Sequence, residues 1–336
     1  MEGPTLADIA EQAGVSQATV SRMLNDKPGV SEATRQAVLT ALDVLGYVRP
    51  AHLRPITTGM IGLIVPELVN PIFAAYAQAV ETDTARAGFA TLVCTQAPGG
   101  MREDQYFEVL RSRQAAGIIV VSGSHADTTA DLSTYRSLID VGLPMVLVNG
   151  FAPGVEAPFI SDDDASAMDQ AVDHLATLGH RRIGLALGPQ RYVPVRRKEV
   201  GFRAAMIRRF GTDEGTRVAY SIYSATGGGQ AAADLLGEGV TAIICASDIM
   251  TMGAIRSIRA HGLSVPGDVS VIGCDDSPVS RYWDPGVTSV RQNVDLIASM
   301  AVSTLVGQIH GESPATGERL VRPDLVIRST TGPARG

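Results

Sequence analysis

The chain has 336 residues, and its 28 basic and 35 acidic side chains give a formal net charge of −7. Its hydrophobic content of 45% and charged content of 19% exclude an intrinsically disordered chain. No apolar run approaches the roughly 18 residues that span a bilayer, and acidic residues stand where a signal peptide would be basic and then apolar. We therefore expect two domains with a small appendage, located in the cytoplasm and without a membrane partner.

The first 48 residues contain no run that is typical of a β-strand. Apolar residues recur there at helical spacing over three stretches, 6–12, 16–24 and 32–45. Gly14 predicts a tight turn after the first helix, and Ser16 stands where the second helix would begin. This order indicates a helix-turn-helix unit, in which the second helix enters the major groove of DNA.

The outward side chains of this unit suit contacts with double-stranded DNA. Gln pairs with adenine, Arg with guanine and Ala with the thymine methyl group, while hydroxyls reach phosphates. The candidate DNA contacts, including two in the linker, are Thr5, Ser16, Gln17, Ala18, Thr19, Ser21, Arg22, Asn25, Ser31, Thr34, Leu53 and Arg54. Residues 1–50 carry six acidic against four basic side chains, so affinity would depend on dimerisation and on uncharged donors. A simple αα-hairpin with a polar face is the structural alternative.

From residue 60 onward, short apolar runs alternate with amphipathic stretches of helical length. The predicted strands cover 60–65, 90–95, 117–121, 145–149, 182–188, 217–223, 242–246 and 269–273. The predicted helices include 71–87, 105–113, 165–178, 197–210 and 249–261. This alternation predicts βαβ units and parallel sheets covered by helices on both faces. The runs are apolar throughout, as strands buried on both faces must be.

Eight predicted strands exceed one doubly wound sheet of about five or six strands, so we expect two α/β lobes. The first lobe would comprise about 60–160 and 288–318, and the second about 161–287 and 319–330. Ligands of such sheets bind beside the carboxyl ends of the strands, which places the candidate site in a cleft between the lobes. The predicted fold is an all-α helix-turn-helix head (1–48), a linker (49–59), and two doubly wound parallel-sheet lobes (60–336).

Enzymatic motifs are absent from the sequence. It has no GxSxG motif, Walker loop or HExxH motif, and the glycines at 227–229 lack the spacing of a phosphate or dinucleotide loop. Cys94, Cys245 and Cys274 stand far apart, which excludes a disulfide framework or a cysteine metal site and fits a reducing compartment. We therefore expect no catalytic activity, no metal ion and no cofactor.

A series of motifs along the chain resembles one family. The head carries TLADIAEQAGVSQATVSRMLN and VSEATRQAVLTALDVLGY, and the lobes carry IGLIVP, NPIF, HLATLGHRRIGL, ASDIMTMGAIRSI, VPGDVSVIGCDD and VTSVRQ. In this order they resemble the LacI family of bacterial transcriptional repressors. The resemblance implies lobes of periplasmic-binding-protein type, a homodimer, a pseudo-palindromic operator, and a small effector, most often a sugar, bound in the cleft.

The linker departs from the family pattern. Family members usually carry a longer segment, with a short hinge helix that inserts a leucine into the minor groove. Here Pro50 and Pro55 enclose only four residues, of which Leu53 is the candidate wedge. Pro55 also disfavours helix at Arg54. The linker is therefore either a compressed hinge or a passive tether.

The resemblance also implies a set of effector contacts, matched motif by motif. They are Phe73, Asp163, Arg196, Lys198, Tyr223, Asp248 and Asp275. Asp275 is the expected acceptor for ligand hydroxyls, and Tyr223 stands where some relatives stack an aromatic ring on the sugar. Lys198 replaces the usual arginine, and because a point charge does not match a forked donor, Arg196 could take over that role. In the structural alternative, Asp163 and Asp248 cap helices, Phe73 belongs to the core and the basic run faces solvent.

The favoured function is a repressor that a sugar releases from its operator. Two alternatives remain open: co-repression by a purine-like ligand, on whose base Phe73 could stack, and a cytoplasmic sugar-binding module without regulatory release. The lack of a signal peptide and the helix-turn-helix head both argue against a sugar-transport protein.

Overall fold

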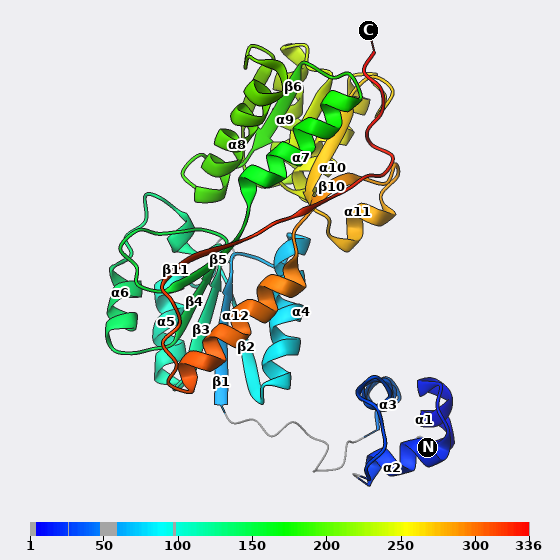
Figure 1. Cartoon of the computed structure of the whole chain (residues 1–336), viewed down its shortest axis with the longest axis vertical. Helices are drawn as coiled ribbons and strands as arrows, with labels where there is room; N and C mark the ends of the chain where they lie inside the picture. Colours follow the sequence, from blue (N-terminus) through cyan, green and yellow to red (C-terminus); the bar gives the residue numbers. More distant parts are fainter. Residues whose placement is uncertain (1–4, 26, 48–58, 97–98, 336) are drawn as a thin grey trace. The chain divides into compact units, whose positions relative to one another are not determined.

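The computed structural model describes residues 5–25, 27–47, 59–96 and 99–335. The chain divides into two compact units, Met1–Thr57 and Thr58–Gly336 (Figure 1). The described part of the first unit is helical, and the second unit contains two six-stranded sheets with helices on their faces. Within the described ranges, no helix has both the length and the apolar character needed to cross a membrane.

Three helices form the described part of the first unit, the head: α1 (Leu6–Ala13), α2 (Gln17–Leu24) and α3 (Glu32–Val44). Each follows a hydroxyl residue, Thr5, Ser16 or Ser31, whose side chain accepts a hydrogen bond from the backbone N–H three residues later. Gly14 ends α1 with φ +66°, a left-handed conformation that favours glycine. The three predicted helices are confirmed to within a residue.

The apolar faces of these helices form a small core of their own. Its buried members are Ile9, Ala10, Val20, Met23, Val38, Ala41 and Leu42. Because α1 and α2 both pack against α3 and against each other, the polar face of α2 is left to solvent.

The first sheet of the larger unit has the strand order β11-β5-β4-β3-β1-β2, and its neighbouring strands are all parallel. Its strands are β1 (Gly59–Val65), β2 (Phe89–Thr95), β3 (Gly117–Val121), β4 (Met145–Val148), β5 (Pro158–Asp162) and β11 (Gly317–Val321). Its helices are α4 (Pro71–Arg86), α5 (Glu103–Ser112), α6 (Ser133–Asp140), α12 (Val294–Ile309) and the short 3-10 helix η2 (Ser124–Ala126). We call this part lobe one.

Alternate residues of β1 show why its run is apolar throughout. Ile61, Leu63 and Val65 pack in the core that includes α4 and α12. Ile64 packs on the other face, in the core that includes α5 and α6. Successive side chains of a strand point to opposite faces, so a strand covered on both sides needs an apolar residue at every position.

The second sheet has the order β12-β10-β9-β8-β6-β7, in which β12 runs antiparallel to β10 and the other neighbours are parallel. Its strands are β6 (Ile183–Leu187), β7 (Thr216–Tyr220), β8 (Ala242–Cys245), β9 (Ser270–Asp275), β10 (Thr288–Arg291) and β12 (Asp324–Val326). Its helices are α7 (Asp164–Thr177), α8 (Val193–Phe210), α9 (Ala225–Gly237), α10 (Asp248–Ala260) and α11 (Pro278–Tyr282). We call this part lobe two.

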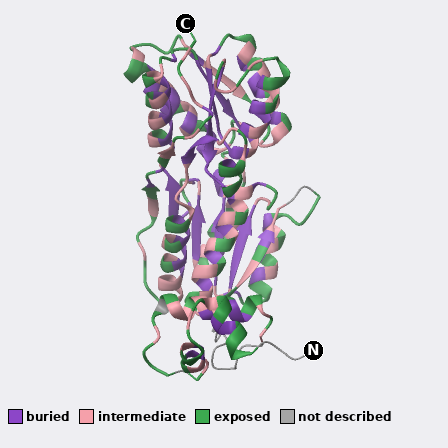
Figure 2. Ribbon diagram, turned by 90° about the vertical axis from the view of Figure 1, so that its right-hand side faces the viewer, coloured by how far each residue is buried: buried purple, intermediate pink, exposed green. Residues whose placement is uncertain are grey.

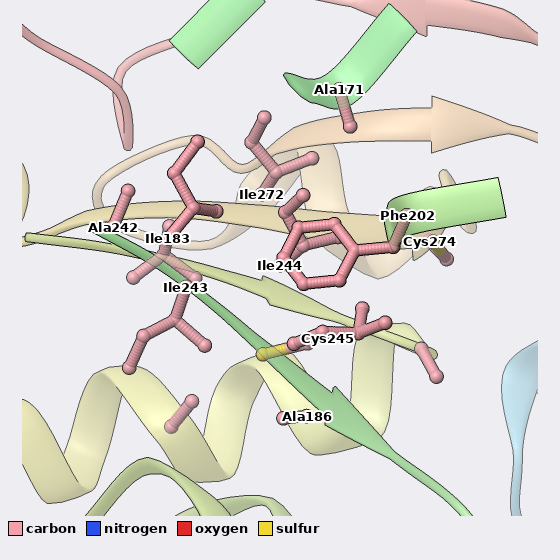
Figure 3. Close-up of a cluster of buried hydrophobic side chains, with 14 of the residues drawn as sticks. Ala171, Ile183, Ala186, Phe202, Ala242, Ile243, Ile244, Cys245, Ile272 and Cys274 are labelled. Carbon is pink, nitrogen blue, oxygen red and sulfur yellow. The ribbon is translucent and has the colours of Figure 1, made fainter. Parts of the chain in front are cut away.

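Each lobe is built around its buried sheet. In lobe two, side chains of β6, β8 and β9 meet Ala171 of α7 and Phe202 of α8 in one apolar cluster (Figure 3). Buried residues are concentrated in the strands of both sheets, whereas the outer faces of the helices are exposed (Figure 2). Helices on both faces of a sheet leave the ends of its strands as the place where a ligand can reach it.

The chain crosses between the lobes three times. The crossings follow β5, separate β10 from α12, and separate β11 from β12. Because β10 pairs with β9 and β11 pairs with β5, the expected boundaries near 288 and 318 lie a few residues too early and need correction. Hydrogen-bond partners decide which sheet a short strand joins, and apolar periodicity does not show those partners.

Helices α9 and α10 approach closely because glycines of each face the backbone of the other. A Cβ atom at Gly228 would lie 2.1 Å from the Met250 carbonyl oxygen, and one at Gly253 would lie 1.8 Å from the Ala225 carbonyl oxygen. We expect Gly253→Ala to force the helices apart and lower the free energy of unfolding by about 1–3 kcal/mol. Urea denaturation measures the loss. Gly237→Ala is the control, because a methyl group there meets open space and should not destabilise the protein.

Candidate DNA-binding surface and effector pocket

Helix α2 presents a polar face to solvent. Gln17, Ala18 and Arg22 are exposed, whereas Val20 and Met23 on its other side are buried in the core of the head. Residues three and four apart share a helix face, so the exposed residues form one surface. This is the arrangement in which a recognition helix offers side chains to base edges in the major groove.

The predicted hydroxyl contacts lie at the N-termini of the head helices. The hydroxyl pairs at the starts of α2 and α3 are hydrogen-bonded, with oxygen–oxygen distances of 2.9 and 2.8 Å. Helix N-termini carry free backbone N–H groups and a partial positive charge, which suits them to phosphates. The residues at these three ends are Thr5, Ser16, Thr19, Ser31 and Thr34.

Two further predicted contacts are Ser21, within α2, and Asn25, at its C-terminal end. Asn25 caps the helix, and its side-chain Nδ2 donates to the Ser21 carbonyl oxygen at 2.7 Å. Leu53 and Arg54 lie outside the described residues, as does the whole segment in which a hinge helix was considered.

A pocket of about 230 Å³ lies between the two lobes, at the carboxyl ends of their strands. Four aromatic residues line it: Phe73, Tyr76, Tyr192 and Tyr223. Its polar lining includes Asn70, Ser122, Asn149, Lys198, Ser247, Asp275 and Gln292. The pocket thus brings together four of the seven predicted effector contacts, Phe73, Lys198, Tyr223 and Asp275.

The aromatic rings come from both lobes. Phe73 and Tyr76 lie on α4, and Phe73 also packs against the core of lobe one. Tyr223 lies beyond the end of β7, in the turn before α9, and not in a strand as expected. Its ring occupies the space that a side chain at Gly188 would need, since a Cβ atom there would lie 2.1 Å from Tyr223 Cε2. Such rings can contact the apolar face of a sugar or a base.

Asp275 ends β9 with φ +103°, a backbone conformation that residues other than glycine rarely adopt. Its Oδ1 accepts a hydrogen bond from Gln292 Nε2 at 2.7 Å, and its Oδ2 accepts one from the Asp248 backbone N–H at 3.3 Å. Tyr76 Oη in turn donates to Gln292 Oε1 at 3.3 Å, which links the carboxyl group to lobe one. Burial, together with the nearby charge of Asp248, raises the pKa of Asp275 well above its usual range.

Lys198 reaches the pocket from α8 of lobe two. Its ammonium group forms a buried ion pair with the Asp164 carboxylate at the start of α7. Burial is the largest single influence and opposes the ammonium charge, but the Asp164 charge and the other groups around the ammonium together outweigh burial and raise the pKa of Lys198. The pocket therefore holds a charged, paired donor. Over the described ranges, no group of three or more His, Cys, Asp or Glu side chains could hold a metal ion.

Three predicted effector contacts do not line this pocket. Arg196 is exposed, and both it and Asp163 border a different cavity beside α8. Asp163 is the N-cap of α7. Asp248 is buried behind the pocket, where its Oδ2 accepts a hydrogen bond from the Ser277 backbone N–H at 2.7 Å. These three contacts stay predictions that this pocket does not bring together, and the two aspartates bond local backbone N–H groups.

Family models match both parts of the chain. One described as "Bacterial regulatory proteins, lacI family" matches residues 5–50, and one described as "Periplasmic binding protein-like domain" matches 172–331. The HTH-type transcriptional regulator MalR of Streptomyces coelicolor is 52% identical over 335 residues, which cover 98% of this chain and 97% of that one. The chain belongs to the LacI family. It is therefore a DNA-binding transcriptional regulator.

Other LacI-family proteins match over nearly the whole chain. The HTH-type transcriptional repressor CytR of Escherichia coli is 31% identical, covering 97% of this chain and 96% of that one. The structure of a CelR–cellobiose complex superposes with a TM-score of 0.72 at 30% identity, over 97% of this chain and 99% of that one. The structure of the Lac repressor dimer bound to operator and the anti-inducer ONPF superposes with a TM-score of 0.68 at 27% identity, over 98% of this chain and 100% of that one. The predicted fold is confirmed.

Several pocket residues of this LacI-family regulator escape prediction from the sequence. Ser122 and Asn149 directly follow β3 and β4 with φ +49° and +65°, and Asn149 Nδ2 donates to Ser122 Oγ at 2.6 Å. Strained backbone of this kind is enriched at ligand sites. A polar residue directly after an apolar strand is a signal that could have identified both. Tyr76 carries no such signal, because a tyrosine on the apolar face of a helix looks like core. Gln292 directly follows β10, but that strand, TSVR, is not an apolar run.

Proposed function

We propose that this regulator is a homodimeric repressor that binds a pseudo-palindromic operator and leaves it when a small saccharide occupies the pocket between the lobes. The observation that carries the proposal is the composition of the pocket. Asp275, Asn149 and Gln292 offer oxygen acceptors for hydroxyl groups, and aromatic rings from both lobes offer apolar faces. The cellobiose bound in the CelR complex supports a saccharide of one or two rings.

A ligand can change DNA affinity only if it binds two lobe arrangements with different affinities. The pocket meets this condition, because Phe73 and Asn149 belong to lobe one while Tyr223 and Asp275 belong to lobe two. A ligand that contacts both sides favours one angle between the lobes. In a dimer, that angle would alter the spacing of two heads that must fit half-sites about one DNA turn apart.

A thermal-shift screen of the full-length protein tests the effector. Glucose, ribose, maltose and cellobiose form one panel, and adenosine, guanine and hypoxanthine form the other. A ligand that binds only the folded state raises the melting temperature. Operator DNA selected from a random pool then reports whether the ligand releases or strengthens binding. A melting shift from a purine alone, with tighter DNA binding, would replace induction by co-repression.

The exposed face of α2 gives a prediction for DNA recognition. We expect Arg22→Ala to weaken binding to the selected operator by about 1–3 kcal/mol and to relax the base preference at one position of each half-site. Lys27→Ala is the matched control, because Lys27 is an exposed cation of the head beyond α2. The Lys27 variant should bind all DNA sequences more weakly by the same factor, and its DNA affinity should depend less on salt concentration. Fluorescence anisotropy with selected and scrambled duplexes distinguishes the two patterns, and an unchanged preference in the Arg22 variant would contradict the assigned recognition helix.

A further inference from the structure

Two segments from different lobes are joined beside the pocket. Thr128, which follows β3 in lobe one, donates to the Arg191 carbonyl oxygen of lobe two through its backbone N–H at 2.9 Å and its Oγ1 at 2.8 Å. Arg191 Nε donates back to Asp127 Oδ2 at 2.8 Å. Asp127 and Tyr192 also form an isolated antiparallel bridge. We call these contacts between residues 127–128 and 191–192 the clasp.

The lobe-one side of the clasp is firmly anchored. The Ser124 backbone N–H and the Tyr135 hydroxyl donate to the buried Glu103 carboxylate at 3.0 and 2.7 Å. The His125 ring is buried, with its Nε2 3.1 Å from the Val148 carbonyl oxygen. These contacts hold η2, which directly precedes Asp127. Lobe one therefore presents a fixed edge to lobe two, and opening the clasp requires movement between the lobes.

The lobe-two side of the clasp borders the ligand space. Tyr192 lines the pocket, and Arg191 holds its ring in two ways. Arg191 Nη2 donates to the Tyr192 hydroxyl at 2.9 Å, and the Arg191 guanidinium carbon lies 4.7 Å from the centre of the Tyr192 ring. Arg191 itself is not among the residues that line the pocket. It acts on the pocket through Tyr192 and through the position of the lobes.

We propose that Arg191 is a positioning residue for effector capture, which fastens the lobes at the edge of the pocket and fixes the Tyr192 ring against the ligand. The proposal rests on the proposed function, in which a ligand occupies this pocket. Contacts that exist only in the closed arrangement raise its population, and a bound ligand leaves only after they break. Arg191 thus sets how long the ligand stays, although the ligand does not touch it.

Hydrogen exchange measures the clasp without any ligand. The Thr128 backbone N–H exchanges when its bond to the Arg191 carbonyl oxygen opens, and Arg191→Ala keeps that carbonyl while removing the guanidinium. An exposed ion pair stabilises by roughly 0.2–1 kcal/mol, so the variant should exchange about 1.4- to 5-fold faster at Thr128. The control is Arg217→Ala, because Arg217 pairs with Glu238 within lobe two at 2.8 Å with comparable exposure. Equal exchange at Thr128 in the parent and in Arg191→Ala would overturn the proposal.

A double-mutant cycle distinguishes the loss of a contact between the lobes from a local disturbance of one loop. Asp127 also accepts hydrogen bonds from the Thr129 backbone N–H and hydroxyl, so Asp127→Ala alone disturbs lobe one. If the clasp is real, Arg191→Ala should add little to the exchange rate once Asp127 has been removed. Arg191→Lys should restore part of the protection, because the ammonium can pair with Asp127 but cannot form the flat guanidinium contact with the tyrosine. Additive effects of the two alanine substitutions would count against a cross-lobe pair.

Stopped-flow dissociation of maltose and of cellobiose measures the effect on the ligand. In Arg191→Ala the dissociation rate should rise by at least the factor found in hydrogen exchange, with the association rate and melting temperature nearly unchanged. An unchanged dissociation rate together with faster exchange would show that the clasp opens without governing the ligand, which would overturn the proposed role. If neither sugar binds the parent protein, glucose and ribose replace them in the same measurement. If none of the four binds, the saccharide proposal fails, and the clasp is judged by the exchange rates alone.

Discussion

Replacing Asp275 with alanine should shift the response to effector to a much higher effector concentration while leaving operator binding intact. The carboxyl group lies in the pocket of the larger unit, whereas the DNA-reading face belongs to the separate unit formed by the head. Loss of a buried hydrogen-bond acceptor costs about 1–3 kcal/mol, so effector affinity should fall by roughly 5- to 150-fold. The variant also leaves Gln292 Nε2 without its acceptor at 2.7 Å. Titrating effector onto the protein–operator complex measures the loss, and a release curve equal to that of the parent would remove Asp275 from the site.

The neighbouring aspartate provides the contrast for this experiment. The side chain of Asp276 is fully buried, and it pairs with Arg291 at 2.8 Å and with Arg328 at 2.6 Å. Asp276 does not line the pocket. Asp276→Ala should therefore lower the free energy of unfolding by about 3 kcal/mol, because it leaves two cations without their partner. Below its melting temperature, the variant should still respond to effector.

Asp162→Asn should stabilise the protein at alkaline pH and reduce the fall in its stability as the pH rises. Asp162 ends β5 at the first crossing between the lobes, and both of its buried carboxyl oxygens lack a hydrogen-bond partner. Burial, with a smaller effect of the Asp164 charge, raises the pKa of Asp162 to about 7, although the Lys198 charge opposes the rise. The ionised form is therefore disfavoured in the folded protein.

The sign of the pH effect follows from proton uptake. Between about pH 4 and pH 7, the folded protein keeps a proton on Asp162 that the unfolded chain has released. Stability is therefore greatest below this range and falls as the pH rises through it. At pH 8 the asparagine variant should be more stable than the parent by up to about 4 kcal/mol, and at pH 4 the two should be alike.

Urea denaturation at pH 4, 6 and 8 measures this difference. Asp163→Asn is the matched control, because Asp163 caps α7 by accepting a hydrogen bond from the Ser166 backbone N–H at 3.1 Å, and asparagine caps a helix equally well. This variant removes the neighbouring carboxylate and leaves Asp162 in place, so it should not reproduce the stabilisation at pH 8. Parallel stability curves for the Asp162 variant and the parent would show that Asp162 is ionised at no cost in the folded state.

Local patterns in the sequence were sufficient for the head and for most strands. The head helices begin at Thr5, Ser16 and Ser31, because a hydroxyl that bonds the next turn starts a helix wherever the chain lies. The run predicted over 60–65 is β1 (Gly59–Val65), because burial on both faces requires an apolar residue at every position. The order of motifs along the chain was also sufficient to identify the family.

The tertiary structure alone decided which residues share the pocket. Arg196 and Lys198 are two residues apart on α8, about 200° around the helix axis, so they cannot face the same ligand. The packing of α8 in lobe two decides that Lys198 is the one that lines the pocket. Asp275 and Asp248 both lie at the cleft end of lobe two, yet only Asp275 lines the pocket, and Asp248 bonds the backbone behind it. A sequence shows which chemical groups are available and the local structure they favour. Their distances and burial depend on contacts between segments far apart in the chain, and these form only when the lobes pack.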